Sequence, residues 1–201
     1  MRVSVIDYKA GNLTSVLKAL RHLGAEPVVT DSDLSAIEQA ERIVLPGVGH
    51  FAATQRLDAT AMTGAIRTAI SRGVPFLGIC VGMQWLYSGS TEAAQQPGLG
   101  HFPEQCSRFP DGSEKVPHVG WNSLEVRGGS RLFAGLDSGE HVYFTHSYKA
   151  PITSDTSAVA DYIEPFAAAV ERANVMGVQF HPEKSGETGL KILRNFLEMK
   201  R

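Results

Sequence analysis

The sequence has little cysteine and no long apolar run. Its two cysteines, Cys80 and Cys106, could form at most one disulfide, and the reducing cytosol would not maintain that bond. No apolar stretch approaches the length of a membrane span, and residues 1–7 lack both a charged leader and a cleavage site. We therefore expect a cytoplasmic protein with no membrane partner, in which Cys106 is a small buried residue.

An excess of charge of one sign is also missing. The chain has 19 basic and 21 acidic residues, a formal net charge of −2, and no basic block. This balance argues against nucleic acid and against an anionic membrane surface as partners. The 7 histidines are scattered, and none pairs with a cysteine or a second histidine at the spacing of a zinc site. We expect neither a metal nor a cofactor.

The first half of the chain alternates short apolar strands with amphipathic helices. A chain of 201 residues with 43% hydrophobic content can bury one sizeable core, so we predict a single domain over residues 1–201. The alternation predicts an α/β fold, with an open, mostly parallel sheet and helices on both faces. The predicted strands are residues 3–6, 26–29, 42–45 and 75–79, and the predicted helices are residues 13–23, 32–40 and 62–70.

The second half, from about residue 105, has strand patterns without intervening helices. We therefore expect the sheet to be mixed, because these strands must add antiparallel pieces to it. A final amphipathic helix carries Leu190, Leu193, Phe196 and Leu197 on one face and closes the fold. The predicted strands are residues 105–109, 121–126, 142–145, 158–162, 167–171 and 175–180.

Cys80 stands between two glycines, directly after the apolar strand 75–79. Residues 78–82 read Gly-Ile-Cys-Val-Gly, the G-x-C-x-G form of a nucleophile elbow, in which a strand turns abruptly into a helix. The glycines remove side chains that would clash with the neighbouring strand or with the helix. Free N–H groups at the start of a predicted helix over residues 81–87 would favour a thiolate. Taken alone, the pattern fits a buried packing cysteine equally well.

A candidate base follows the last predicted strand. A cysteine nucleophile needs an imidazole to hold the thiolate and protonate the leaving nitrogen, and the imidazole needs an acceptor that fixes its tautomer. His181 and Glu183 fit these roles. Pro182 cannot donate to a sheet ladder and marks the strand end, and residues i and i+2 of an extended segment project to the same side. We predict a catalytic triad of Cys80, His181 and Glu183, although the segment alone also fits a simple turn.

A glycine-containing loop follows the strand 42–45. Sites in parallel sheets lie beyond the carboxyl ends of the strands, so this Pro-Gly-Val-Gly loop can meet Cys80 there. Glycine permits either peptide orientation, and the loop could therefore turn an N–H toward a developing negative charge. A phosphate-binding or packing turn is the alternative. The predicted oxyanion donors are the backbone amides of Val81, Gly47, Val48 and Gly49.

In their order along the chain, these segments resemble the landmarks of the class I (triad) glutamine amidotransferases, and among them the amidotransferase subunits of imidazole glycerol phosphate synthase. The resemblance spans nearly the whole chain. The chain departs from the family pattern at Lys9, Trp85 and Val119, where glycine, an aliphatic residue and methionine are common. The segments that carry the resemblance are residues 7–8 (Asp-Tyr), 11–12 (Gly-Asn), 45–49 (Leu-Pro-Gly-Val-Gly), 78–84 (Gly-Ile-Cys-Val-Gly-Met-Gln), 115–122 (Lys-Val-Pro-His-Val-Gly-Trp-Asn), 143–148 (Tyr-Phe-Thr-His-Ser-Tyr) and 179–185 (Gln-Phe-His-Pro-Glu-Lys-Ser).

The resemblance implies a three-layer sandwich fold and a glutaminase that converts L-glutamine to glutamate and ammonia. It also implies a heterodimer with the (β/α)8-barrel cyclase subunit of imidazole glycerol phosphate synthase. That partner uses the ammonia to make imidazole glycerol phosphate and aminoimidazole carboxamide ribotide in L-histidine biosynthesis. The positions that it places at the partner interface are Asn12, Trp121, Tyr143 and Lys184. The positions that it places around the amino-acid end of glutamine are Gln84, Glu92, Gly49, Ser147 and Tyr148.

Three other interpretations remain open at this point. The chain could be an amidotransferase subunit of another synthase, such as those that make pyridoxal phosphate, purines or anthranilate. It could be a stand-alone cysteine hydrolase that turns over without a partner. It could also be a silent interaction module in which Cys80 only packs. Likewise, Gln84 and Tyr148 could be ordinary packing residues, and Lys184 a solvated charge.

Overall fold

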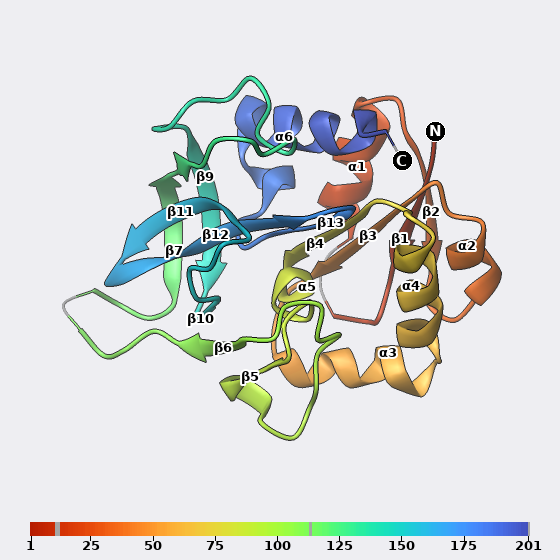
Figure 1. Ribbon diagram of the computed structural model, residues 1–201, viewed down its shortest axis with the longest axis horizontal. Coiled ribbons are helices and arrows are strands. Elements are labelled where there is room, and N and C mark those ends of the chain that lie inside the picture. Colours follow the sequence, from red (N-terminus) through yellow and green to blue (C-terminus); the bar gives the residue numbers. More distant parts are fainter. Residues whose placement is uncertain (11–12, 113, 201) are drawn as a thin grey trace.

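An eight-stranded mixed sheet forms the centre of the molecule (Figure 1). The structure is a computed structural model that describes residues 1–10, 13–112 and 114–200. The strand order is β2-β1-β3-β4-β13-β12-β11-β8; the strands from β2 to β13 are parallel, and β12, β11 and β8 are antiparallel to their neighbours. The strands are β1 (Arg2–Ile6), β2 (Glu26–Thr30), β3 (Arg42–Gly47), β4 (Phe76–Cys80), β8 (Glu125–Val126), β11 (Thr156–Tyr162), β12 (Glu164–Arg172) and β13 (Val175–Val178).

Helices cover both faces of this sheet, so the molecule has three layers (Figure 1). Helices α1 and α6 lie on one face, and α2 to α5 lie on the other. The predicted α/β class and mixed sheet are confirmed. The helices are α1 (Thr14–His22), α2 (Leu34–Glu38), α3 (Gln55–Ala59), α4 (Met62–Ser71), α5 (Val81–Gln84) and α6 (Gly186–Glu198), with 3-10 turns η1 (Phe51–Thr54), η2 (Thr91–Ala93) and η3 (Pro182–Lys184).

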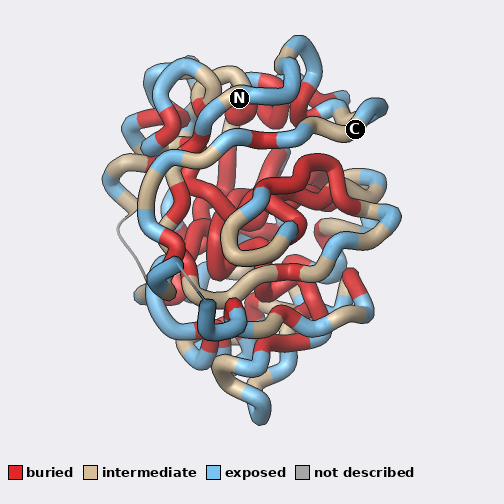
Figure 2. The backbone as a smooth tube through the Cα atoms, turned by 90° about the vertical axis from the view of Figure 1, so that its left-hand side faces the viewer, coloured by how far each residue is buried: buried red, intermediate tan, exposed pale blue. Residues whose placement is uncertain are grey.

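The core lies along the central strands, which are covered from both sides. Every residue of β3, β4 and β13 is buried, and Figure 2 shows this buried backbone in the middle of the molecule. Strands that are covered on two faces need near-continuous apolar sequence, and these segments have it. Helix α1 instead buries one stripe, formed by Val16, Ala19 and Leu20. No helix among the described residues is both long and apolar enough to cross a membrane.

Part of the second half does not join the main sheet. Strands β7 (His118–Ser123) and β9 (His141–His146) pair only with each other, as an antiparallel ribbon at one end of the molecule (Figure 1). Strands β5 (Gly89–Ser90), β6 (Gln105–Arg108) and β10 (Tyr148–Lys149) form a third small sheet. The expectation that the later strands add to one sheet was therefore wrong for β6, β7 and β9, and the short strands β5 and β10 were not predicted. Pairing partners are set by distant contacts, which periodicity does not report.

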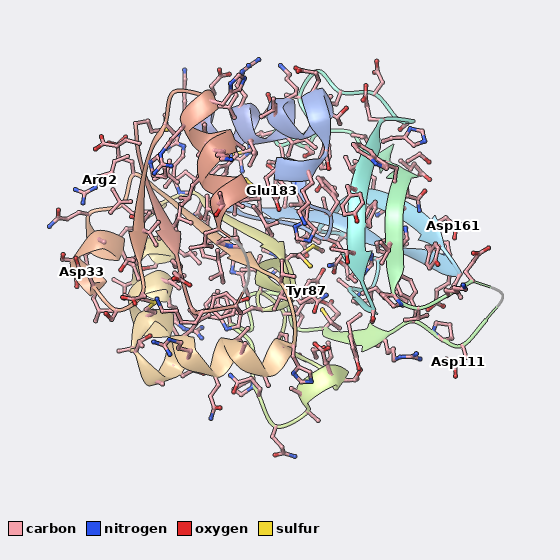
Figure 3. All side chains as sticks on the ribbon, turned by 180° about the vertical axis from the view of Figure 1, so that it is seen from behind. Arg2, Asp33, Tyr87, Asp111, Asp161 and Glu183 are labelled. Atoms are coloured by element: carbon pink, nitrogen blue, oxygen red, sulfur yellow. The ribbon has the colours of Figure 1, made fainter. Side chains whose placement is uncertain are left out.

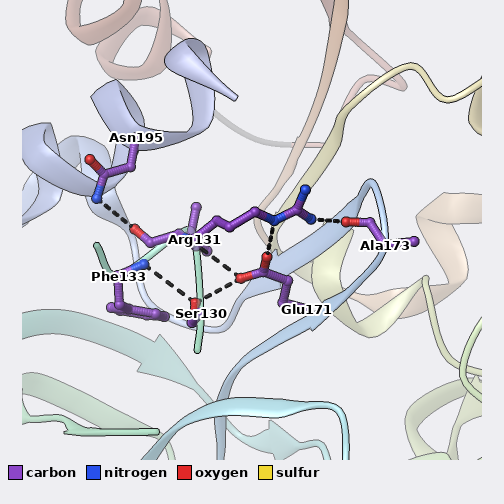
Figure 4. Close-up of polar contacts among 7 residues, drawn as sticks. Ser130, Arg131, Phe133, Glu171, Ala173 and Asn195 are labelled. Carbon is purple, nitrogen blue, oxygen red and sulfur yellow. Dashed lines mark hydrogen bonds and ion pairs between the residues drawn. The ribbon is translucent and has the colours of Figure 1, made fainter. Parts of the chain in front are cut away.

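One carboxylate holds the loop after β8 against the main sheet (Figure 4). Glu171 on β12 accepts hydrogen bonds from Ser130 Oγ and Arg131 Nε, both at 2.7 Å, and from the Leu132 backbone N–H at 3.3 Å. On the other side of the loop, Asn195 on α6 donates to the Leu132 carbonyl oxygen at 3.0 Å. This network joins β12, the loop and α6, the helix that follows η3.

Candidate active site

Cys80 is the last residue of β4 and immediately precedes α5. Its backbone has φ 55° and ψ −109°, in the positive-φ region that costs a non-glycine residue on the order of 1–3 kcal/mol. A side chain at Gly82 would collide with the Leu45 carbonyl oxygen, and one at Gly78 would collide with the Gly82 backbone. Both glycines are therefore required by close backbone approach, as the elbow pattern predicts. The helix after Cys80 is shorter than predicted, because α5 ends at Gln84.

His181 and Glu183 are in direct contact. Nδ1 of His181 lies 2.8 Å from Oε1 of Glu183, and both side chains are almost completely buried. Figure 3 shows Glu183 in the interior of the molecule, in contrast to Asp111 and Asp161 at its edge. The expectation that an extended segment brings the two side chains together was wrong, because Glu183 lies in the 3-10 turn η3. The turn folds the carboxylate back toward the imidazole.

The environment of His181 favours its protonated form. Burial acts to lower the pKa of His181, but the interactions with Cys80 and Glu183 outweigh burial and raise it to about 10. Nε2 of His181 is buried and has no hydrogen-bond partner among the described residues. An imidazole that interacts with a cysteine, and whose Nδ1 is held by a carboxylate, can keep a thiolate paired and later deliver a proton from Nε2.

Strand β9 fixes the backbone on both sides of His181. The His181 N–H donates to the Tyr143 carbonyl oxygen at 2.9 Å. The Tyr143 N–H donates to Ser185 Oγ at 2.9 Å, and that hydroxyl donates to the His181 carbonyl oxygen at 2.6 Å. The position of the imidazole therefore depends on the β7–β9 ribbon as well as on β13.

The Cys80 sulfur has two polar neighbours that sequence reasoning did not assign to the site. Gln179 donates an Nε2 hydrogen to Sγ at 3.6 Å, and Sγ lies 3.9 Å from the Thr145 carbonyl oxygen. Gln179 is completely buried. The sequence offered one signal for Gln179, which is the only amide side chain in the apolar run 175–180. A buried amide requires hydrogen-bond partners, so this residue could have been expected to contact other polar groups.

All five predicted substrate residues line one cavity with Cys80. The cavity has a volume of about 250 Å³ and also touches Val48, Val81, Pro117, Thr145 and His146. Glu92 has a second contact, because its Oε2 accepts a hydrogen bond from the Phe51 N–H at 2.7 Å. The predicted substrate residues in the cavity are Gln84, Glu92, Gly49, Ser147 and Tyr148.

The predicted oxyanion loop lies beside Cys80, but one of its amides points elsewhere. Val48 and Gly49 line the cavity together with Val81. The Val48 N–H donates to the Ala10 carbonyl oxygen at 3.4 Å, so it is engaged away from the sulfur. Gly49 has φ 107°, a value that glycine adopts readily. Gly47 packs so closely against the Tyr8 hydroxyl that no side chain fits there.

Three of the four predicted interface residues form one surface cluster on and beside the β7–β9 ribbon. Trp121 is 57% exposed, and its ring meets the Tyr143 ring edge to face with centroids 6.1 Å apart. Lys184 Nζ lies 5.8 Å from the centre of the Tyr143 ring. Val119, also 57% exposed, extends the apolar area along β7. We call Val119, Trp121, Tyr143 and Lys184 the ribbon patch; the fourth prediction, Asn12, lies outside the described residues.

Cys106, unlike Cys80, does not line the cavity. It is completely buried, both thiols are free, and burial raises the pKa of the Cys106 thiol. The prediction that Cys106 is a small buried residue is confirmed.

The family model of glutamine amidotransferase class-I matches residues 4–199. A solved structure entitled "Crystal structure of glutamine amidotransferase" has the same fold, with a TM-score of 0.77 at 21% sequence identity, over 98% of this chain and 97% of that one. The chain therefore belongs to the class I glutamine amidotransferase family.

Two curated relatives place it within that family. The imidazole glycerol phosphate synthase subunit HisH of Syntrophotalea carbinolica is 44% identical, over 98% of this chain and 100% of the relative. The protein of the same name from Methanosarcina acetivorans is also 44% identical, over 98% of each chain. The resemblance predicted from the motifs, to the amidotransferase subunits of this synthase, is confirmed over nearly the whole length.

Proposed function

We propose that this chain is the glutaminase subunit of an imidazole glycerol phosphate synthase, which hydrolyses L-glutamine to glutamate and ammonia in L-histidine biosynthesis. One observation carries the proposal. Cys80, held at positive φ, opens on a cavity and interacts with a buried imidazole whose other nitrogen is bonded to a carboxylate. The 44% identity to synthase subunits supports the choice of synthase. Two free thiols suit the reducing cytoplasm, where we place the protein.

In the first half-reaction, the Cys80 thiolate attacks the side-chain amide carbon of glutamine. The C–S bond forms, and the carbonyl electrons move onto oxygen. We assign the oxyanion to the amide of Val81 and to the loop of Gly47, Val48 and Gly49, where the Val48 N–H would first have to leave the Ala10 carbonyl oxygen. His181 then gives the Nε2 proton to the nitrogen as the C–N bond breaks, and ammonia leaves a γ-glutamyl thioester.

In the second half-reaction, the same imidazole removes a proton from water. The resulting hydroxide attacks the thioester carbon, the C–S bond breaks, and glutamate is released while the sulfur regains its negative charge. Glu183 accepts a hydrogen bond from Nδ1–H throughout and stabilises the imidazolium that is consumed in the first half-reaction and restored in the second. The cavity residues Gln84, Glu92 and Tyr148 are proposed to hold the amino-acid end of the substrate.

Glutamate release from glutamine tests the catalytic assignment. We expect Cys80→Ala to lose turnover by at least about 1,000-fold, because no other group can form the thioester. Cys106→Ala is the matched control: it removes the other thiol from a site with no access to the cavity, and it should keep turnover near the unaltered level. A Cys80→Ala protein that still releases glutamate would overturn the assignment.

Ammonia needs an acceptor, and the family relationship suggests which one. We propose a heterodimer with the (β/α)8-barrel cyclase subunit, which docks on the ribbon patch and receives the ammonia before it is lost to water as ammonium. Tryptophan and tyrosine are enriched in protein interfaces, and here the exposed Trp121 lies beside Tyr143. The bond from His181 N–H to the Tyr143 carbonyl would transmit docking to the base.

The partner proposal is tested by measuring glutamate release alone, with a cognate cyclase subunit, and with that subunit plus its phosphoribosyl substrate. We expect weak release by the chain alone and a strong increase with the liganded partner. Full activity alone, with no increase on addition of the partner, would favour the stand-alone hydrolase. Activity that rises only with the acceptor subunit of another synthase would show that the chain is an amidotransferase subunit of that synthase instead.

A further inference from the structure

A chain of hydrogen bonds runs inward from β7 through two buried histidines. Nδ1 of His118 lies 3.1 Å from Nε2 of His146, and Nδ1 of His146 lies 2.9 Å from the Tyr148 carbonyl oxygen. At the outer end, Nδ2 of Asn122 lies 3.5 Å from Nε2 of His118, the longest of these three contacts. The two imidazoles are 3% and 6% exposed.

The same carbonyl connects the histidines to the nucleophile. Gln84 Nε2 donates to the Tyr148 carbonyl oxygen at 3.0 Å and to Gln179 Oε1 at 3.0 Å, so both of its hydrogens are used. Gln179 Nε2 then donates to the Cys80 sulfur at 3.6 Å. We call this series, from Asn122 through His118, His146, the Tyr148 carbonyl, Gln84 and Gln179 to Cys80, the amide–imidazole chain.

Chemistry fixes the proton positions in this chain. A carbonyl oxygen only accepts, so His146 must carry its proton on Nδ1. Nε2 of neutral His146 is then an acceptor, which requires a proton on Nδ1 of His118. Nε2 of His118 is left to accept from the Asn122 amide. A further proton on either ring would set two N–H groups against each other.

The surroundings keep both rings in this state. His118 is stacked between Phe144, at 4.7 Å between ring centres, and Tyr162, at 4.0 Å. Burial lowers the pKa of His118 to about 4 and that of His146 to about 3, so both are neutral at pH 7. The stacking also offers a purely packing explanation for His118, and the experiment below separates the two roles.

We propose that His118 and His146 are positioning residues for the glutamine cavity. Their fixed protons hold the Tyr148 carbonyl in place, and that carbonyl orients the Gln84 amide on the cavity wall. Gln84 in turn aligns Gln179, whose N–H stabilises negative charge on the sulfur. The predicted effect on turnover rests on the proposed glutaminase function, whereas the predicted effect on the Cys80 thiol does not.

Two substitutions of His118 separate hydrogen bonding from packing. His118→Phe keeps a flat ring between Phe144 and Tyr162 but removes the donor to His146. His118→Asn loses the ring but places an amide nitrogen where Nδ1 was. His141→Phe, on the exposed start of β9, is the matched control. The readouts are the rate of Cys80 alkylation by iodoacetamide, located by peptide mass spectrometry, and kcat/KM for glutamine with the cyclase subunit present.

We expect His118→Phe to slow Cys80 alkylation and to lower kcat/KM, each by about tenfold, because it leaves a buried acceptor unpaired. His118→Asn should recover most of both values, and His141→Phe should match the unaltered chain. The reverse order, with Phe close to normal and Asn impaired, would show a packing role and overturn the proposal. Unchanged alkylation in both His118 variants would overturn it as well.

A second variant cuts the chain at its last bond, in case His118→Phe does not fold. Gln179→Met keeps the approximate shape of the side chain and removes the donor to the sulfur. It should slow alkylation by about the same factor, and an alkylation rate equal to that of the unaltered chain would contradict the proposal. If the unaltered chain releases no glutamate under any condition, the proposed function fails, while the alkylation rates still decide the positioning role.

Discussion

The backbone of Cys80 is strained, because a residue with a side chain occupies a positive φ there. A positive φ combined with ψ −109° places a non-glycine residue where its Cβ meets neighbouring backbone atoms. The flanking glycines allow this turn, because side chains at positions 78 and 82 would collide with the backbone. The result is a buried cysteine that lines the cavity.

This strain predicts the order of stability of two inactive variants. Cys80→Gly should be more stable than Cys80→Ala by about 1–2 kcal/mol, because glycine relieves a strain of about 1–3 kcal/mol and gives back part of it as unfolded-chain entropy. Urea unfolding of both proteins measures the difference.

Position 64 serves as the control for that comparison. Gly64 lies within α4 with open space around it, so Gly64→Ala should stabilise the protein by about 0.5–1 kcal/mol. Equal stability of the two Cys80 variants, with Gly64→Ala behaving as stated, would show that the elbow is not strained.

At the scale of elements, the β7–β9 ribbon carries two histidines that resist protonation. Their pKa values lie near 4 and 3, below the value of about 6.5 expected in the unfolded chain. Below pH 6.5 the unfolded chain therefore binds protons that the folded chain does not. The two neutral histidines therefore contribute their full stability above pH 6.5, and this contribution is lost as the pH falls toward their folded-state pKa values.

We therefore expect acid to destabilise the protein through this ribbon. Each histidine should reduce the free energy of unfolding by about 1.4 kcal/mol per pH unit between roughly pH 6 and pH 4.5. His118→Asn should make that slope shallower by about one histidine's share, as measured by urea unfolding at several pH values. His141→Asn, on the same ribbon but exposed, serves as the control; an unchanged slope in His118→Asn would contradict the burial argument.

The elements also show what the sequence could and could not predict. Strands β1, β3 and β4 follow from their apolar sequence, because they are almost entirely buried, and helix α1 follows from the single stripe that it buries. The contact between His181 and Glu183 was predicted, but through an extended segment rather than the turn η3. Gln179 was missed because its role depends on which side chains a buried amide meets in three dimensions.

At the scale of the whole molecule, the proposed partner surface and the nucleophile share one end of the fold. The ribbon patch lies on β7, β9 and η3. The backbones of β9 and η3 are hydrogen-bonded to that of His181, and β7 pairs with β9, while β2 forms the far edge of the main sheet (Figure 1). Docking on the ribbon would therefore act on the base through two or three hydrogen bonds, whereas no hydrogen bond among the described residues joins β2 to His181.

Trp121→Ala should weaken binding of the cyclase subunit by at least about 30-fold, because a central tryptophan in an interface typically contributes 2 kcal/mol or more. Its thermal stability should change little, since the side chain is largely exposed in the free chain. Val29→Ala on β2, where the valine is 44% exposed, should bind normally. Isothermal titration calorimetry gives both affinities. An unimpaired Trp121→Ala would remove the ribbon patch from the interface.

The measurement that bears most directly on the central claim is a search for the γ-glutamyl thioester. The chain, together with the liganded cyclase subunit, would be mixed with glutamine, quenched in acid during turnover, and digested for mass spectrometry. The account predicts one γ-glutamyl group on the peptide that contains Cys80, and none on the peptide that contains Cys106. Steady glutamate release with an unmodified Cys80, and with the same rate in Cys80→Ala, would contradict it.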